Sequence, residues 1–282
     1  IDVKVGPDGA IYIADWYNPI IQHGEVDFRD PRRDHTRGRI WRVTAKNRPL
    51  VDRPKLVGAQ VPALLEGLKA PEAYTRRQAK RVLKERGVDE VLPALKKWVA
   101  ALDPKDPQFE RNRLEGLWMF QALDVPNPEL IAQATTSKDF RVRAAGARIV
   151  PFWKGRAPEV ESLLDPLVVD ENPRVRLEAV RSLAAMPSEQ AARTAFRALG
   201  KPMDAFLDYA LWLAARDLAP AWLPAVEAGK LDALGNAKNL TFALQALGSA
   251  AVLQPMLKLY HEGRIPAEQD AAVLNLIAAL GG

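Results

Sequence analysis

The feature that most constrains the fold is a small residue followed by an apolar residue four positions later, a pair that recurs along most of the chain. Residues four apart lie on the same face of a helix, so each pair marks a helix with one close-packed side. The intervals between successive small residues are 37, 30, 33, 31, 33 and 29 residues, a near-constant period typical of structural repeats. The pairs are Ala79/Leu83, Gly116/Phe120, Gly146/Val150, Ala179/Leu183, Ala210/Ala214, Ala243/Leu247 and Ala272/Leu276.

The stretch before each pair also shows apolar residues with a period of about 3.6, so each repeat is predicted to contain two helices. One helix pair cannot bury its apolar face alone, whereas stacked pairs share a continuous core. We therefore predict a mainly α protein, with a right-handed α-solenoid of about six to seven helix pairs over residues 59–282.

Two of these repeats resemble a known family in their wording. DFRVRAAGARIV (139–150) and ENPRVRLEAVRSL (171–183) place Asp or Asn, Val-Arg, a small residue and an apolar residue in the order typical of HEAT repeats. The resemblance implies a HEAT-like solenoid. An arginine also stands three positions before each of the first four small residues, at Arg76, Arg113, Arg143 and Arg176.

Residues 1–48 have a different character, because short runs rich in β-branched and aromatic residues replace the helical period. They predict a short antiparallel β-meander, and Asp8-Gly9 between the first two runs is a strong hairpin signal. Residues 49–58, with two prolines, are interpreted as a linker to the helical repeats. The predicted strands are 2–5, 10–14 and 39–43.

Composition excludes several classes of site within this chain. The 282 residues include no cysteine, which rules out disulfides, thiolate metal sites, covalent c-type haem attachment and cysteine nucleophiles. No window approaches the apolar length of a transmembrane helix. No G-x-G-x-x-G, G-x-x-x-x-G-K-S/T, G-x-S-x-G or H-E-x-x-H motif occurs, so we expect no complete catalytic centre in this piece. The formal charge of +5 permits anionic partners without selecting one.

The densest group of chemically capable side chains lies in the charged loop 15–38, between the second and third predicted strands. Loops of this length without secondary structure are uncommon and are usually functional or disordered. Its carboxylates and imidazoles could contact a substrate or transfer protons on an active face. The same acids and arginines could instead form an ion-pair network that clamps the loop. The candidate residues are Asp15, His23, Asp27, Arg29, Asp30, Arg33 and His35.

A weaker candidate in the same loop is a metal site formed by His23, Glu25 and Asp27. These residues alternate along the chain, so an extended segment would present them on one face. Oxygen and imidazole ligands suit several divalent ions. Their spacing matches no specific metal motif.

The N-terminal segment resembles one blade of a six-bladed β-propeller of the NHL or sorbosone/glucose dehydrogenase type. The resemblance rests on V-x-P-D-G-x-x-Y-x-A-D, from Val5 to Asp15, and on G-R-I-W-R-V, from Gly38 to Val43. About twenty residues separate the two parts where an ordinary blade has a short turn. The longer wording resembles a group of large envelope proteins of planctomycetes and verrucomicrobia described as membrane-bound dehydrogenases.

That second resemblance implies a parent protein in which a propeller precedes HEAT-like repeats and a c-type cytochrome domain often follows. This chain, which starts directly in a predicted strand, would be a piece holding the last blade and the repeats. Its partners would be the rest of the propeller and a neighbouring cytochrome or other protein domain, in the cell envelope or periplasm. Haem c and a quinone-type cofactor would lie elsewhere in the parent, with none in this chain. The parent would oxidise a sugar or a related alcohol or aldehyde.

A basic helix offers an alternative in another class. Residues 75–86 carry six basic side chains, and HEAT-like repeats also occur in alkylpurine DNA glycosylases, which hold duplex DNA on a basic surface. The candidate contacts are Arg76, Arg77, Lys80 and Arg81. No later repeat continues the basic stripe, so a solvated helix face is favoured and nucleic acid is not.

Five tryptophans in the helical part stand at helical spacings and are expected in the core between repeats. They are Trp98, Trp118, Trp153, Trp212 and Trp222. The sequence therefore favours a scaffold or interaction segment of a larger dehydrogenase, not catalytic alone. A general protein-interaction solenoid and a nucleic-acid-binding HEAT protein stay open as alternatives.

Overall fold

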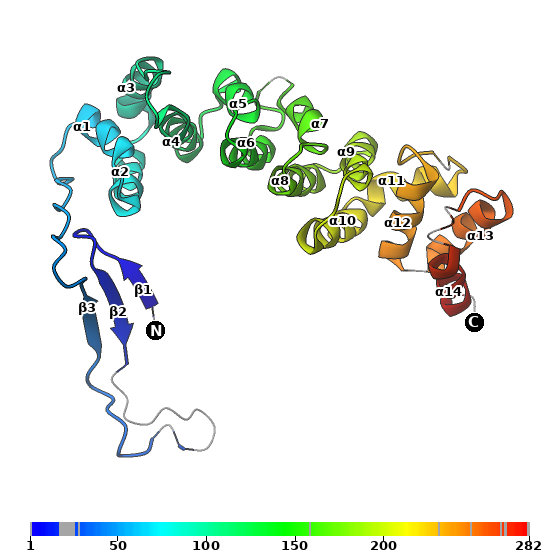
Figure 1. Ribbon diagram of the computed structural model, residues 1–282, viewed down its shortest axis with the longest axis horizontal. Coiled ribbons are helices and arrows are strands. Elements are labelled where there is room, and N and C mark those ends of the chain that lie inside the picture. Colours follow the sequence, from blue (N-terminus) through cyan, green and yellow to red (C-terminus); the bar gives the residue numbers. More distant parts are fainter. Residues whose placement is uncertain are drawn as a thin grey trace. The chain divides into compact units, whose positions relative to one another are not determined.

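A computed structural model describes residues 2–16, 26–27, 29–157, 159–230, 232–248, 250–265, 267 and 270–280. The chain divides into two compact units, Ile1–Leu102 and Asp103–Gly282. The first holds a small sheet and helices α1 to α3, and the second holds α4 to α14 (Figure 1). The predicted class, mainly α with HEAT-like repeats and a short N-terminal antiparallel sheet, is confirmed.

The sheet contains three antiparallel strands in the order β1 (Asp2–Val5), β2 (Ile11–Asp15) and β3 (Arg39–Val43). The hairpin between β1 and β2 closes where Asp8-Gly9 predicts it. Gly9 has a φ of 78°, a conformation that glycine adopts without steric cost, and the Gly6 amide donates to the Ala10 carbonyl at 2.8 Å.

The strand register gathers apolar side chains on one face of the sheet. Val3 lies opposite Ile13, Val5 lies opposite Ile11, and on the other side Ile11 and Ile13 lie opposite Val43 and Trp41. Successive strand residues point to opposite faces, so these side chains share one face. That apolar face is defined by Val3, Val5, Ile11, Ile13, Trp41 and Val43, and all but the half-buried Ile13 are exposed.

A buried carboxylate ties the opposite face of the sheet together. Asp8 is 3% exposed and accepts hydrogen bonds from Arg42 Nη2 at 2.7 Å, Tyr12 Oη at 3.0 Å and the Ala10 amide at 3.1 Å. Burial raises the pKa of Asp8, but the hydrogen bonds from Arg42, Ala10 and Tyr12 outweigh it and lower the pKa to about 2. The Asp8 carbonyl also accepts from the Val51 amide, which fastens the chain after β3 to the hairpin.

Replacing Asp8 by Asn should loosen the sheet in a pH-dependent way. The folded pKa of Asp8, about 2, lies below its ordinary value of 3.8, so its stabilisation is full above the ordinary value and is lost as the pH falls towards 2. Hydrogen–deuterium exchange of β1–β3 amides in the whole chain should therefore be faster in Asp8→Asn near neutral pH. Wild type and variant should converge as the pH approaches 2. Asp2→Asn, at an exposed pair with Lys4, should change little; an equal loss of protection there would contradict the assignment.

Helices make up most of the described chain, and none of those described is long and apolar enough to cross a membrane. Short 3-10 turns lie at Gly67–Lys69, Val160–Leu163, Phe196–Gly200 and Ala250–Val252. The helices are α1 (Val61–Glu66), α2 (Ala73–Arg86), α3 (Val88–Ala100), α4 (Phe109–Ala122), α5 (Pro128–Thr135), α6 (Phe140–Trp153), α7 (Leu164–Leu167), α8 (Pro173–Ala184), α9 (Glu189–Ala195), α10 (Ala205–Asp217), α11 (Ala219–Glu227), α12 (Ala237–Leu247), α13 (Leu253–His261) and α14 (Asp270–Leu280).

In the second unit the helices stack in two layers (Figure 1). Helices α4, α6, α8, α10 and α12 contact one another in succession, whereas α9, α11 and α13 form contacts on the other side. The small residues of the repeat mark the tightest approaches. Ala179 and Ala243 are fully buried, and a Cβ on Gly146 would lie 3.1 Å from Thr135 Cγ2 and 3.2 Å from the Thr135 nitrogen. Close packing of α6 on α5 therefore explains the glycine.

The arginine three positions before the small residue has a structural role. Arg143 donates through Nη1 to the carbonyls of Ser137 and Lys138, in the loop that precedes its own helix. Its Nε and Nη2 form a two-point contact with Asp170, at 2.8 and 2.9 Å, in the next repeat. Arg143 thus joins one loop to the next.

Arg176 repeats this pattern, and Arg76 repeats its backward half. Arg176 donates to the carbonyls of Asp170 and Glu171 behind it and to the Pro202 carbonyl ahead of it. Arg76 donates to the carbonyls of Ala70 and Pro71 in the first unit. The guanidinium supplies several fixed donors, so one side chain can satisfy loop carbonyls that would otherwise lack partners.

Arg143→Ala should destabilise the second unit by about 3 kcal/mol, because it leaves the Asp170 carboxylate and two loop carbonyls without their partner. The Arg143 and Asp170 side chains are only 12% and 10% exposed, so water replaces the contact poorly. Urea unfolding followed by circular dichroism measures the loss. Arg141→Ala, whose side chain is 77% exposed beside Asp139, should cost below about 1 kcal/mol. Equal losses in the two variants would show that the repeat arginine has no special role.

Candidate functional site

Helix α10 carries large apolar side chains on its exposed side as well as on the side that packs against neighbouring helices. Leu207, Leu211 and Ala214 are buried, but Phe206 is 77% exposed and Tyr209 is 61% exposed. An apolar helix surface of this kind is typical of a contact region, since exposed patches of several large apolar side chains often mark interaction sites. The exposed stripe consists of Phe206, Tyr209, Trp212 and Leu213.

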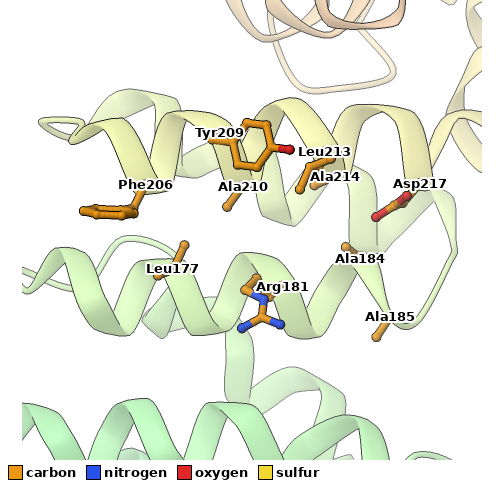
Figure 2. A pocket seen from close by; sticks show the side chains of 10 residues that line it. All are labelled: Leu177, Arg181, Ala184, Ala185, Phe206, Tyr209, Ala210, Leu213, Ala214 and Asp217. Carbon is orange, nitrogen blue, oxygen red and sulfur yellow. The ribbon is translucent and has the colours of Figure 1, made fainter. Parts of the chain in front are cut away.

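A groove of about 480 Å³ runs between this stripe and helix α8. Figure 2 shows Phe206, Tyr209 and Leu213 along the α10 side, with Leu177 and Arg181 on α8. Small side chains make room between the two helices. They are Ala184, Ala185, Ala210 and Ala214.

A cluster of three arginines, Arg148, Arg174 and Arg181, surrounds one buried carboxylate at the α6 side of this groove. Glu178 on α8 is 2% exposed and accepts from Arg148 Nε at 2.9 Å as well as from Arg148 Nη2. Arg174 Nη2 lies 3.0 Å and Arg181 Nη1 lies 3.9 Å from the Glu178 carboxylate. Three guanidinium groups thus face one carboxylate, and all three are more than half exposed.

A second hollow of about 400 Å³ lies between α6 and α8, beside the first groove. It contains Trp118 from α4 and Phe140 from α6, together with Arg148, Arg174 and Glu178. The two hollows adjoin at the arginine cluster, because Glu178 lines one and its neighbour Arg181 lines the other. We call them together the α6–α8–α10 groove.

The electrostatics of the groove are set by Glu178. Burial raises the pKa of Glu178, but the hydrogen bonds from Arg148 and the charges of Arg148, Arg174 and Arg181 outweigh it, so the pKa lies below its ordinary value. Glu178 stays ionised at neutral pH and holds the arginines in place. The groove therefore offers apolar contact area and positive charge, a combination suited to binding.

Glu178→Gln should weaken the α6–α8 contact by about 1–2 kcal/mol, because the neutral amide holds the guanidinium groups less strongly. The pKa of Glu178 is lowered on folding, so this stabilisation is present above its ordinary value of 4.5 and is lost as the pH falls below it. Urea unfolding at several pH values should show the difference between wild type and variant shrinking in acid. Glu161→Gln, an exposed control, should differ little from wild type throughout. A pH-independent difference would contradict this role.

The described part of the charged loop uses its acidic side chains locally. Asp30 accepts from the Arg32 amide and guanidinium, and these hydrogen bonds hold the pKa of Asp30 well below its usual range. Arg33 is buried and donates to the carbonyls of Val26 and Asp27. These contacts order a tight turn.

Two further acids of the charged loop, Asp27 and Asp15, also accept hydrogen bonds. The Asp27 carboxylate accepts from the Arg29 amide at 2.8 Å, and Asp15 accepts from Trp41 Nε1 at 3.0 Å. Arg29 and His35 are exposed. These contacts bring Asp27, Arg29, Asp30 and Arg33 together in one turn. The clamp and the active face both stay predictions.

The predicted metal site falls largely outside the described residues, since His23 and Glu25 are not among them. Among the residues that are described, no group of three or more His, Asp or Glu side chains is placed to hold a metal ion. The hypothesis of a site at His23, Glu25 and Asp27 therefore stays a prediction.

The basic helix α2 uses several of its cations within the first unit. Arg76 contacts loop carbonyls, Arg81 pairs with Glu85 at 3.4 Å, and Arg77 lies over the Tyr74 ring at 6.0 Å. Lys80 is half-buried. Phosphate binding needs charges displayed along a groove. The nucleic-acid interpretation of these four residues stays a prediction.

Two of the five tryptophans expected in the core are partly exposed. Trp153 and Trp222 are fully buried and Trp98 nearly so, as expected. Trp118, however, lines the groove, and Trp212 is 37% exposed, stacked on Tyr209 with Arg216 4.7 Å from its ring centre. The signal was available in AFLDYALWL (205–213), where large apolar residues occupy every side of one helix.

Two family models match parts of the chain. Residues 1–47 match a domain of unknown function (DUF7133), and residues 127–214 match HEAT repeats. No curated protein matches. The second match covers α5 to α10 and contains most of the α6–α8–α10 groove.

Several solved structures are similar to this chain. An engineered protein shares 18% identity with a TM-score of 0.39, covering 78% of this chain and 67% of its own. The CpcE–CpcF complex of phycocyanin lyase from Nostoc sp. PCC7120 shares 19% identity with a TM-score of 0.38, covering 84% and 99%. Residues 127–214, within the helical part of the chain, consist of HEAT repeats.

Proposed function

We propose that this chain is a scaffold, the interaction segment of a larger protein, and is not an enzyme by itself. One observation carries the proposal: the sheet presents an apolar face of six residues, and five of them are exposed. A three-stranded sheet is marginal alone and needs packing on one face. The HEAT repeats add a second contact surface of a kind suited to binding proteins.

The finer proposal follows from the blade-like wording of residues 1–48. The sheet is the last blade of a propeller-type dehydrogenase, and the repeats hold that propeller beside a partner such as a c-type cytochrome domain. The parent oxidises a sugar, alcohol or aldehyde and uses haem c, with a quinone-type cofactor, outside this chain. Its place is the cell envelope. The open apolar face supports this reading, because a neighbouring blade would cover it.

The complete coding sequence tests the finer proposal most directly. It should carry five further blade patterns upstream and a C-x-x-C-H motif downstream. The purified parent should show the absorption of c-type haem, and a sugar, alcohol or aldehyde should reduce that haem. A parent with neither blades nor C-x-x-C-H refutes the dehydrogenase assignment and leaves only the general scaffold.

Carbene footprinting should reveal the covered face. In this chain Val3, Val5 and Val43 should react readily with a photogenerated carbene, because they are exposed, whereas in the parent a neighbouring blade should protect them several-fold. Ile40, on the opposite face and 75% exposed, is the internal reference. Mass spectrometry of the peptides measures both. Equal labelling of the apolar face in chain and parent would remove the observation on which the scaffold proposal rests.

A further inference from the structure

The α6–α8–α10 groove combines an exposed apolar stripe with a cluster of three arginines. Its α10 side presents Phe206, Tyr209 and Leu213, at spacings of three and four residues, so they form one continuous stripe. Phe206 alone leaves 77% of its surface open to water. Burial of such side chains is the main favourable contribution to protein association.

The shape of the groove suits inserted side chains. The alanines between α8 and α10 leave a volume of about 480 Å³, and the adjoining hollow between α6 and α8 has about 400 Å³. Both are open along the helix layer, which fits an elongated segment of chain better than an enclosed small molecule.

The positive charge of the groove favours a partner segment with negative charge. Arg148, Arg174 and Arg181 share one buried carboxylate, so the cluster has two positive charges in excess of the Glu178 charge. Among the described residues that line the α8–α10 hollow, the acid is Asp217, at the far end of the stripe from Phe206 (Figure 2). A partner with carboxylates over the cluster and apolar side chains on the stripe would meet complementary charge and avoid Asp217.

We propose that the groove binds a segment of a partner protein that is acidic and carries large apolar side chains. Its carboxylates contact Arg148, Arg174 and Arg181, and its apolar side chains pack against Phe206, Tyr209 and Leu213. This inference rests on the proposed scaffold role and adds the place and chemistry of one partner. Nucleic acid fits less well, because a phosphate backbone needs positive charge along its whole path, and the α10 side offers apolar contact and Asp217.

A peptide selection tests the proposal without presuming a sequence. Random peptides of about 16 residues, displayed on phage, are selected against the whole chain, and the consensus peptide is labelled with fluorescein for anisotropy titration. We expect enriched peptides to be rich in Asp or Glu and in Leu, Phe or Trp. The consensus peptide should lose at least about tenfold in affinity when its acids become lysines.

Groove variants with matched controls locate the binding. Phe206→Ala with Tyr209→Ala, and separately Arg181→Glu, should each weaken the peptide at least about tenfold. Phe152→Ala and Arg193→Glu are controls, because both residues are exposed and neither lines the groove. Circular dichroism melting shows that each variant is folded, and the exposed positions make that outcome the expected one.

Three results would overturn the proposal. Enriched peptides without an acidic bias, or equally strong binding by groove and control variants, would place the partner elsewhere. A fluorescent oligonucleotide that binds more tightly than any peptide, and is lost in Arg181→Glu, would make this a nucleic-acid surface. A dimer that sedimentation detects in wild type, but not in Phe206→Ala with Tyr209→Ala, would make the occupant a second copy. Carbene footprinting of the sheet does not depend on these variants, so it separates this inference from the scaffold role.

Discussion

Around helices α6 and α8, the helical part of this protein depends on arginines that satisfy the loops between repeats. A helix pair ends in a loop whose carbonyls no longer have partners within a helix. Arg143 and Arg176 each supply donors to two such carbonyls behind them and reach Asp170 or the Pro202 carbonyl ahead. Apolar packing between helices is non-directional and roughly proportional to the area buried. The arginines fix which loop lies beside which.

The contacts of the two units leave different surfaces open. On one face of the sheet, Asp8 accepts hydrogen bonds from Arg42, Tyr12 and a backbone amide. On the other face, most of the apolar side chains are exposed to water. In the second unit, Glu178 similarly completes the arginine cluster while the stripe of α10 stays exposed. In both places the same part of the fold holds a buried carboxylate with its hydrogen bonds complete and an exposed apolar surface. Burying such an apolar surface against a partner is favourable.

Local pattern was sufficient to predict the architecture but not the site. Strand alternation, the Asp8-Gly9 turn and the small-residue period are short-range signals, and they identified the sheet and the helices. The small residues Ala179 and Ala243 are buried as the period requires. The groove could not be predicted in this way, because it joins residues of α6, α8 and α10 that lie about 30 positions apart, as Arg148 and Glu178 do. Trp212 was misassigned because its spacing resembles that of a core residue. The charged loop attracted attention through composition alone, yet Asp27 and Asp30 are engaged by neighbours within a few residues.

Glu178 also affects how much conformational entropy the arginine side chains lose when a partner binds. An arginine on a free surface samples many rotamers, and a ligand that contacts it must restrict that motion, at about 0.5–1.5 kcal/mol for each immobilised side chain. Contacts with the buried carboxylate have already restricted Arg148 and Arg174 before any partner arrives. The groove is therefore preorganised at its charged end, so these arginines lose less conformational entropy when a partner binds. A short segment could bind such a surface with useful affinity even though its contact area is small.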